Sequence, residues 1–271
     1  MANRNTQGFG LIPAGTLGQT PATAGLGKYK IDAGSATTLY NGSAVASAAG
    51  YIVGLSKEQF ISAFGIALSQ SSGSMQFLND GSWTKRSHVG QAAQNGLNAA
   101  ILAGEGFKGP KEAFEGKCGY LNSFVSGGDL SKALEGLGEK FETLNLGVKP
   151  YPSCRYSHAA IDGLLELKKE INFDVNDLED VDVGLSETAL NIIGYPIEEK
   201  QNPENVVDGQ FSMPFCAALV LRNGSFTWDD YKSNLKNDDV LDLCKKVNVS
   251  PNKQAEECCP KYMSANVKIK V

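Results

Sequence analysis

The sequence is poor in histidine and has no long apolar segment, and each shortage excludes a class of function. Only His88 and His158 occur in 271 residues, and the six cysteines never show C-x-x-C spacing. We therefore expect no metal cofactor. No apolar run approaches the roughly 20 residues that span a bilayer, so we expect no membrane partner. The formal net charge of −5 argues against a nucleic-acid partner, because nucleic-acid binders carry a basic face.

What is present is typical of a globular protein with a substantial core. The chain is 42% hydrophobic and 20% charged, and its length suits one large or two ordinary domains. The first residues lack the apolar core of a signal peptide. Scattered cysteines without such a signal indicate a reducing compartment, so we predict a cytoplasmic protein. A mitochondrial location stays open if a targeting region is missing.

Helical signals dominate the first half. Residues 26–42 show no clean period and are predicted to be a loop or insertion. Ser56 and Gln59 have the spacing of a capping box, which predicts a helix that ends near Gln70. Further helical segments are predicted over residues 44–54, 89–102 and 130–137, near Phe141, and from Pro110 onward. The helix over 89–102 should bury Ala92, Ala93, Leu97, Ala100 and Ile101.

The second half mixes helices and strands. Two prolines make Lys149–Pro152 a rigid extended hinge. Alternation predicts strands over residues 180–185 and 265–271. Helices are predicted over residues 157–170, 210–222, 228–235 and 239–247. The predicted fold is mostly α with a smaller α+β lid domain: a partial helical domain over 1–147, with a loop or insertion at about 20–43, and an α+β domain over 148–271.

The segment of residues 80–96 carries the first candidate site. Its glycine-containing turn brings Lys85, Arg86 and His88 to the start of a predicted helix. Amides at a helix N-terminus carry partial positive charge, so anions bind there. A histidine titrates near neutral pH and can move protons. The combination predicts a site for a small molecule that bears carboxylates.

A second cluster follows the hinge, over residues 149–158. Lys149, Arg155, Tyr156 and His158 fall within ten residues and lead into a predicted helix. Arginine grips a carboxylate as a fork and lysine as a point charge. Two such turns can hold a di- or tricarboxylate, and Tyr156 or His158 can then move a proton.

Both motifs also have a plainer interpretation. The first can be a solvated loop in which Thr84 or Ser87 caps the helix. In the second, Tyr151 and Tyr156 can be packing aromatics, with His158 a cap or a buried residue.

A nucleophilic cysteine is the weaker alternative. Arg155, His158 and a helix start would favour a thiolate at Cys154, but the sequence establishes no general base for it. Asp162 and Glu166 lie four residues apart on one helix face, where most such pairs are solvated.

Four segments resemble the MmgE/PrpD family, which includes 2-methylcitrate dehydratase and cis-aconitate decarboxylase. They are Gly65–Gly73, Gly81–Gly96, Lys149–Asp162 and Gln210–Phe215, and the resemblance extends over about residues 44–271. It implies a helical domain and a smaller α/β lid with a cofactor-free site between them. It also implies the removal of water or carbon dioxide from citrate-like polycarboxylates.

The resemblance also assigns residues. The family's active-site lysine and histidine fall on Lys85 and His88, its hinge lysine on Lys149, and a histidine of its lid motif on His158. Cys154 stands where cis-aconitate decarboxylases carry histidine and other members carry cysteine, which argues against that decarboxylase. We predict these two lysines and two histidines as catalytic residues, and the following as substrate-binding residues: Thr84, Arg86, Cys154, Arg155 and Tyr156.

Three departures from the family pattern support a second hypothesis. The chain is much shorter than the family and lacks its N-terminal helical region, with an acidic residue and a histidine of the site, and its closing C-terminal helices. Ile12 stands at a histidine position of the motif in residues 8–18. Residues 20–43 have no family counterpart. The chain can therefore be a truncated, catalytically impaired paralogue that binds polycarboxylates, as a homodimer or paired with a longer homologue.

Overall fold

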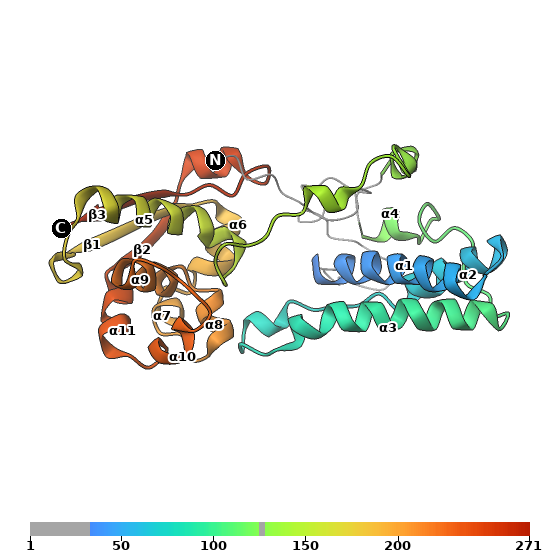
Figure 1. Ribbon diagram of the computed structural model, residues 1–271, viewed down its shortest axis with the longest axis horizontal. Helices are drawn as coiled ribbons and strands as arrows, with labels where there is room; N and C mark the ends of the chain where they lie inside the picture. The colour runs from blue at the N-terminus through green and yellow to red at the C-terminus, as the bar shows by residue number, and fades with distance from the viewer. Residues whose placement is uncertain (1–32, 125–127) are drawn as a thin grey trace. The chain divides into compact units, whose positions relative to one another are not determined.

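The computed structural model describes residues 33–124 and 128–271 (Figure 1). The motif with Ile12, and residues 20–32 of the expected insertion, lie outside these ranges. The chain divides into two compact units whose sequence boundary falls between Asn145 and Leu146. We call residues 33–145 the helical unit and residues 146–271 the mixed unit. No helix in the described residues is long and apolar enough to cross a membrane.

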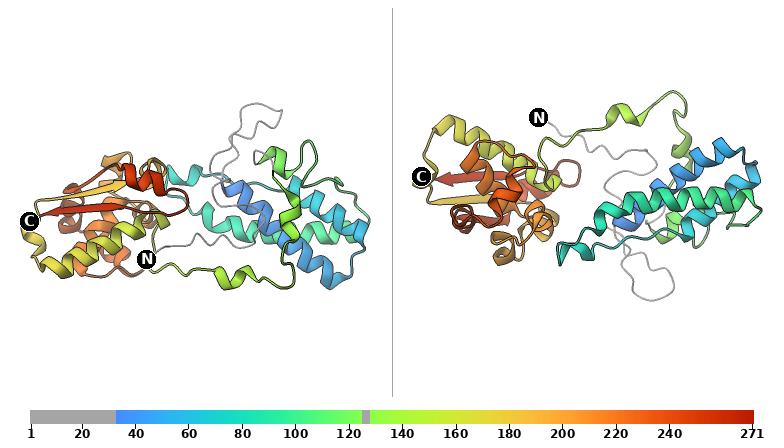
Figure 2. Two further views of the ribbon diagram at one scale, coloured as in Figure 1. Left: turned by 90° about the horizontal axis from the view of Figure 1, so that it is seen from above. Right: turned by 60° about the horizontal axis from the view of Figure 1, so that its bottom comes forward.

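Three helices form the centre of the helical unit: α1 (Ala33–Val53), α2 (Lys57–Ser69) and α3 (Thr84–Gly104). In the two views of Figure 2, α1 lies along α3. Glycine permits this close approach, because a Cβ at Gly96 would lie 2.3 Å from the Gly42 carbonyl oxygen. The core between the helices consists mainly of small side chains, among them Ala46, Ala63, Ala67, Ala99 and Ala103.

Small-residue packing explains two wrong predictions. The expected loop over residues 33–43 is part of the helix α1, whose sequence is rich in Ala, Gly and Ser and has no periodic row of large apolar residues that would indicate a helix. Ala92 and Ala100 are buried as predicted, but Leu97 and Ile101 are 45% and 49% exposed. The close face of α3 admits alanine and glycine, so the larger side chains lie elsewhere on the helix.

The capping box of α2 is confirmed. The Ser56 hydroxyl accepts a hydrogen bond from the Gln59 amide at 3.3 Å, and the Gln59 side chain accepts one from the Ser56 amide at 2.8 Å. The predicted helix at Pro110 is wrong, because Pro110 packs against Gly65 in an irregular segment. The remaining elements are short: η2 (Gln76–Leu78), α4 (Tyr120–Ser123), η3 (Leu130–Leu134) and η4 (Glu142–Asn145).

A three-stranded sheet organises the mixed unit, in the order β2-β1-β3. The central strand β1 (Asp180–Leu185) runs parallel to β2 (Val247–Pro251) and antiparallel to β3 (Asn266–Lys270). Val181 pairs with Val247 on one side and with Ile269 on the other. The predicted strands β1 and β3 are confirmed. We missed β2, whose first residue had been assigned to the end of a helix.

Two helices cover this sheet. α5 (His158–Ile171) contacts β3, and α9 (Met213–Asn223) contacts α5 and β2. Pro214 stands in the first turn of α9, where its missing N–H is tolerated, so the predicted helix forms. The other elements are η5 (Arg155–Ser157), η6 (Val175–Asp177), α6 (Glu187–Ala189), η7 (Leu190–Gly194), α7 (Ile197–Gln201), α8 (Val206–Gln210), α10 (Asp230–Asn234), α11 (Asp238–Lys245) and α12 (Lys253–Cys258).

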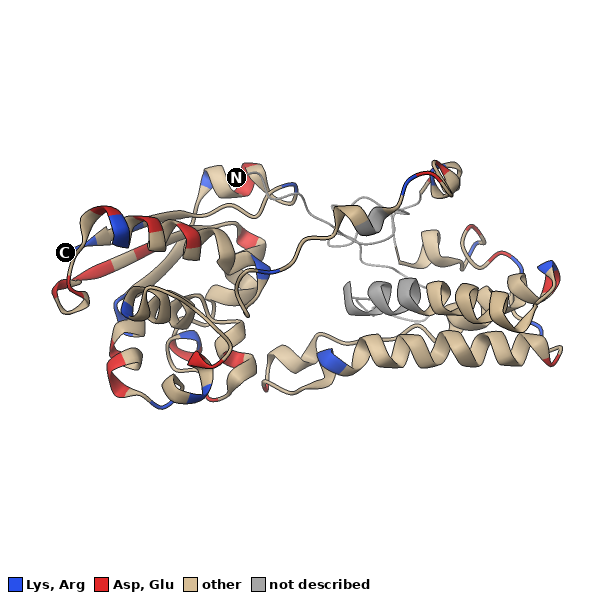
Figure 3. Ribbon diagram, viewed as in Figure 1, with Lys and Arg blue, Asp and Glu red and all other residues tan. Residues whose placement is uncertain are grey.

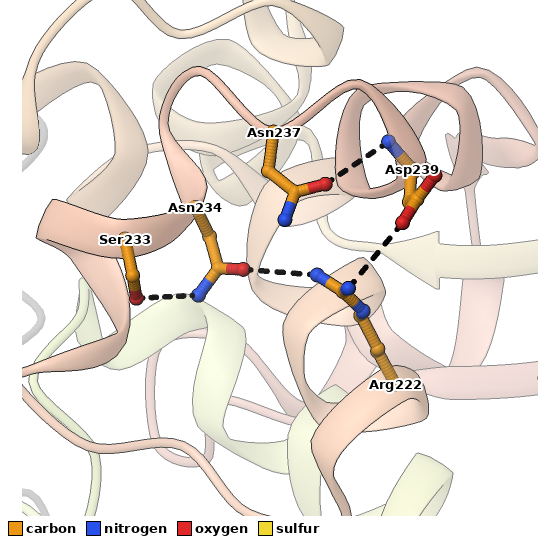
Figure 4. A network of polar contacts seen from close by, with 5 residues as sticks. All are labelled: Arg222, Ser233, Asn234, Asn237 and Asp239. Atoms are coloured by element: carbon orange, nitrogen blue, oxygen red, sulfur yellow. Dashed lines mark hydrogen bonds and ion pairs between the residues drawn. The ribbon is translucent and has the colours of Figure 1, made fainter.

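A polar network joins three of these helices (Figure 4). The guanidinium of Arg222, at the end of α9, donates to the Asn234 side chain of α10 at 3.1 Å and to Asp239 of α11 at 3.4 Å. Charged residues are numerous in the mixed unit, whereas α1, α2 and most of α3 carry few (Figure 3). The basic residues near the start of α3 therefore stand out within the helical unit.

Candidate functional site

The first motif forms the beginning of α3. Thr84 is the first helical residue and Trp83 precedes it without a side-chain cap, so the alternative of Thr84 or Ser87 as the N-cap is wrong. The Ser87 hydroxyl instead donates to the Thr84 carbonyl at 2.7 Å. Lys85 and Arg86 consequently lie in the first helical turn, where the helix dipole favours anions.

Aromatic rings hold the cations of this turn. The Lys85 ammonium lies 5.9 Å from the centroid of the buried Phe77 ring, and the His88 ring meets the same phenyl edge-on at 6.2 Å. The Arg86 guanidinium lies 5.0 Å from the centroid of the exposed Trp83 ring. The structure thus brings Lys85 and His88 together on Phe77. The quadrupole of an aromatic ring attracts a cation that lies over its face.

Exposure distinguishes the members of this motif. Thr84, Lys85 and Arg86 are exposed, and His88 is half-buried. The motif therefore presents its charges to solvent rather than enclosing them.

The second motif is organised around the carbonyl oxygen of Ser153. The Lys149 ammonium donates to this oxygen at 3.1 Å, and His158 Nε2 lies 3.4 Å from it. The Arg155 guanidinium lies 2.8 Å from His158 Nδ1. A guanidinium only donates, so Nδ1 must accept and the imidazole proton must reside on Nε2. Lys149, Arg155 and His158 therefore form one cluster, as the sequence predicted.

His158 is a neutral imidazole in this arrangement. It is 1% exposed, and burial, followed by the charge of Arg155, lowers its pKa from 6.5 to about 4. The Ser153 carbonyl opposes this shift, and Lys149 adds to it. Burial also lowers the pKa of Arg155, against the charge of Asp162.

Tyr151 adds a polar contact that the sequence did not indicate. Its hydroxyl donates to Asp162 at 2.6 Å, and its ring meets His158 edge-on with centroids 5.3 Å apart. Burial, and then the bond to Asp162, raises the pKa of Tyr151 to about 12. The packing role expected for Tyr151 is confirmed, while its hydroxyl anchors the exposed carboxylate of Asp162.

Residues that are distant in the sequence bind the last residue of the hinge, Pro152. The Pro152 carbonyl accepts from Gln210 at 3.1 Å and from the Tyr231 hydroxyl at 2.9 Å, while the Cys154 amide donates to the Gln210 carbonyl at 2.8 Å. Gln210 is the first residue of Gln210–Phe215, one of the four segments that resemble the family. This resemblance is the sequence signal that could have identified Gln210. No local pattern pointed to Tyr231.

Cys154 and Tyr156 complete the turn. Cys154 is half-buried. Burial, followed by the charges of Cys259, Cys154 and Glu256, raises the pKa of Tyr156 to about 12, so it is a neutral phenol at neutral pH.

Sequence reasoning missed a third basic residue of this region. The half-buried Lys200 donates to the Ile192 carbonyl at 3.1 Å. Burial lowers its pKa, and Asp208, Glu199 and Cys154 oppose that shift. Lys200 lies in the short helix α7, outside any turn motif, so nothing in the sequence singled it out.

The predicted residues thus form two groups. Lys85 and His88 meet on Phe77 in the helical unit, with Thr84 and Arg86 in the same turn. Lys149, Arg155 and His158 meet at Ser153 in the mixed unit, with Cys154 and Tyr156 beside them in sequence. Within residues 33–124 and 128–271, no three His, Cys, Asp or Glu residues are placed to hold a metal ion.

Comparison with known proteins matches most of the chain to the two domain models of one family. Residues 16–133 match the model of the MmgE/PrpD N-terminal domain, and residues 151–271 match that of the C-terminal domain. A cis-aconitate decarboxylase of Aspergillus terreus is 26% identical over 234 residues, which cover 81% of this chain and 47% of the relative. The cis-aconitate decarboxylase-like protein oryM of Aspergillus oryzae is 28% identical over 215 residues, which cover 75% and 44%. The chain spans about half the length of these relatives.

Proposed function

Since this chain belongs to the MmgE/PrpD family, we propose that it is a lyase that removes water, or alternatively carbon dioxide, from a citrate-type polycarboxylate. The observation that carries the proposal is the convergence of Lys149 and His158 on the Ser153 carbonyl, with Arg155 bound to the same imidazole. A cluster of this kind, fixed before any ligand binds, suits carboxylate recognition because the cations need little reorganisation.

In this proposal Arg155 and Lys149 bind carboxylates of the substrate, and Lys85 and Arg86 stabilise charge that develops during elimination. His88 moves the proton, since it is half-buried and lies beside Lys85 on the Phe77 ring, whereas the His158 imidazole is already bound to Arg155. Thr84, Cys154 and Tyr156 supply further polar contacts. No step requires a cofactor.

Dehydration breaks two bonds. A base takes a proton from the carbon next to a carboxylate, and the electron pair forms the new double bond as the C–O bond breaks. The hydroxyl leaves as water after it receives a proton. Decarboxylation would instead break a C–C bond, release carbon dioxide and leave an electron pair that takes up a proton. In dehydration, negative charge grows on the carboxylate next to the carbon that loses its proton, so a fixed cation there lowers the barrier. In decarboxylation the leaving carboxylate gives up its charge, so the barrier is lowered only by cations near the part of the molecule that takes up the electron pair.

Product analysis by mass spectrometry tests this function. The protein is given 2-methylcitrate, citrate and cis-aconitate, together with Lys85→Ala and the control Lys108→Ala, whose side chain is exposed in the same unit. We expect loss of water or carbon dioxide that falls by about 10²-fold or more in Lys85→Ala and persists in the control. No product from a folded protein would overturn the lyase, and equal turnover by both variants would overturn the role of Lys85.

A polycarboxylate-binding protein without turnover is the second candidate. Exposed apolar side chains favour it, because they suit pairing with a second copy or a longer homologue. Tyr51 and Ile52, at the end of α1, are 84% and 81% exposed. Binding of citrate without product, with a concentration-dependent mass in sedimentation, would support this reading.

A further inference from the structure

Both ring nitrogens of His158 are engaged inside the protein. Nδ1 receives the Arg155 guanidinium at 2.8 Å, Nε2 faces the Ser153 carbonyl at 3.4 Å, and the residue is 1% exposed. A proton carrier needs a nitrogen within reach of its substrate, directly or through one water. This imidazole offers no such nitrogen, so its chemistry has to act through its neighbours.

Those neighbours are the cations of the turn. Arg155 is held by Nδ1, and Lys149 shares the Ser153 carbonyl with Nε2–H. The His158 imidazole therefore bridges the Arg155 guanidinium and the Ser153 carbonyl, and this carbonyl also binds the Lys149 ammonium. Moving the ring would release Arg155 and remove one of the two donors on Ser153.

We propose that His158 is a positioning residue that stays uncharged and, as its Nε2–H tautomer, aims the Arg155 guanidinium and fixes the carbonyl that holds Lys149. The inference rests on the proposed function only in that Arg155 is expected to meet a substrate carboxylate. It replaces the proton transfer that the sequence suggested for His158.

The groups around the ring explain why it stays uncharged. A proton on Nδ1 would point at the N–H of Arg155 and place a second positive charge beside it. Lys149 adds further repulsion, while the exposed carboxylate of Asp162 gives partial compensation and is itself held by the Tyr151 hydroxyl. Two cations near the ring outweigh the single carboxylate.

Nitrogen-15 NMR of the histidine side chains tests the tautomer without reference to activity. The chain contains two histidines, so His88→Asn leaves the signals of His158 alone. We expect a neutral Nε2–H pattern that is unchanged between pH 7.5 and 5.5. In Arg155→Met, Nδ1 loses its donor and the neighbouring positive charge, so the ring should become protonated at a higher pH than in the parent protein, although it stays buried. A wild-type ring that titrates near pH 6.5, or carries its proton on Nδ1, would overturn the inference even if the protein has no turnover.

Kinetics separate positioning from proton transfer. His158→Asn keeps an acceptor near the place of Nδ1, whereas His158→Leu keeps none. We expect His158→Leu to raise KM by about 10-fold, with a smaller change in kcat, and His158→Asn to recover most of this loss. The pH profile of kcat should not change in His158→Asn. Loss of kcat by about 10²-fold or more in both variants would instead identify His158 as the proton carrier. If the protein shows no turnover at all, the proposed lyase function is contradicted, and the NMR measurement alone decides whether His158 is a positioning residue.

Discussion

The two cationic motifs are held in place by different physics. In the helical unit, Lys85 and Arg86 are exposed and lie against aromatic rings. In the mixed unit, Lys149 and Arg155 are tied to a backbone carbonyl and to a buried imidazole. Charges fixed by directed hydrogen bonds are pre-organised, and charges that lie over aromatic rings are attracted by the face of the ring. The comparison teaches that similar residues can be tied to a buried imidazole and a backbone carbonyl in one unit and lie exposed beside aromatic rings in the other.

The cores of the two units also differ in the size of the side chains that pack in them. Large side chains fill the core of the mixed unit, where Phe215 is fully buried and stacks on Tyr231 with ring centroids 6.0 Å apart. Tyr231 in turn donates to the Pro152 carbonyl before the cluster. In the helical unit, α1 and α3 meet through Gly42, Ala46 and Gly96. Substitutions that remove side-chain volume should therefore destabilise the mixed unit most, and substitutions that add side-chain volume should destabilise the helical unit most.

The largest expected effect on stability comes from Phe215→Ala, which removes a buried ring from the mixed unit. We expect a loss of about 3–5 kcal/mol in the free energy of unfolding, because the cavity adds to the lost transfer energy. Hydrogen exchange measured by mass spectrometry should show faster exchange in α9 and the sheet. Phe107→Ala, at a position 59% exposed, is the control and should change exchange little. Equal effects of the two substitutions would break the comparison.

Acid should weaken the mixed unit through His158. Its pKa of about 4 in the folded protein lies below the ordinary 6.5, so between these values the unfolded chain binds a proton that the folded chain does not. The free energy of unfolding should therefore fall as the pH drops through this window, by roughly 2–4 kcal/mol in total.

Urea unfolding at pH 7 and pH 4.5 measures this loss. The difference between wild type and His158→Asn isolates the imidazole from other groups that titrate, such as Asp208, whose pKa burial raises. If both proteins lose the same stability between the two pH values, the neutral, guanidinium-bound His158 is contradicted.

A smaller effect is expected from Gly96→Ala in the helical unit. The added Cβ would lie 2.3 Å from the Gly42 carbonyl oxygen, so α1 and α3 must separate at a cost of about 1–3 kcal/mol. Gly90→Ala on the same helix meets nothing within 4 Å and should instead stabilise α3 by about 0.5–1 kcal/mol. Hydrogen-exchange rates of the amides in α1 and α3 measure both the loss of stability in Gly96→Ala and the gain in Gly90→Ala. Protection that rises in both variants would show that the helices do not depend on glycine contact.

Local signals made part of the fold predictable. The capping box at Ser56 and Gln59 located the start of α2, and alternation located β1 and β3. The strand β2 was missed because its first residue, Val247, was included in the helix predicted over residues 239–247 and its last residue is a proline, which argues against a strand. α1 was missed because small residues pack closely without an amphipathic pattern.

The candidate site was predictable in the same local sense. Lys149, Arg155 and His158 fall within ten residues, so their proximity followed from the sequence. The direction of the hydrogen bonds did not, because it depends on which nitrogen of His158 meets Arg155. The support of Pro152 by Gln210 and Tyr231 was also hidden, since these residues lie 58 and 79 positions away.

Calorimetric titration of a non-reactive ligand tests the central claim, that the Lys149–Arg155 turn recognises carboxylates. Propane-1,2,3-tricarboxylate has three carboxylates and no hydroxyl to lose. We predict binding that weakens by about 10- to 100-fold in Lys149→Ala, the range expected for one charged hydrogen bond, and is unchanged in Lys236→Ala, an exposed lysine of the same unit. Equal affinity of the wild type and Lys149→Ala, with both folded, would contradict the account.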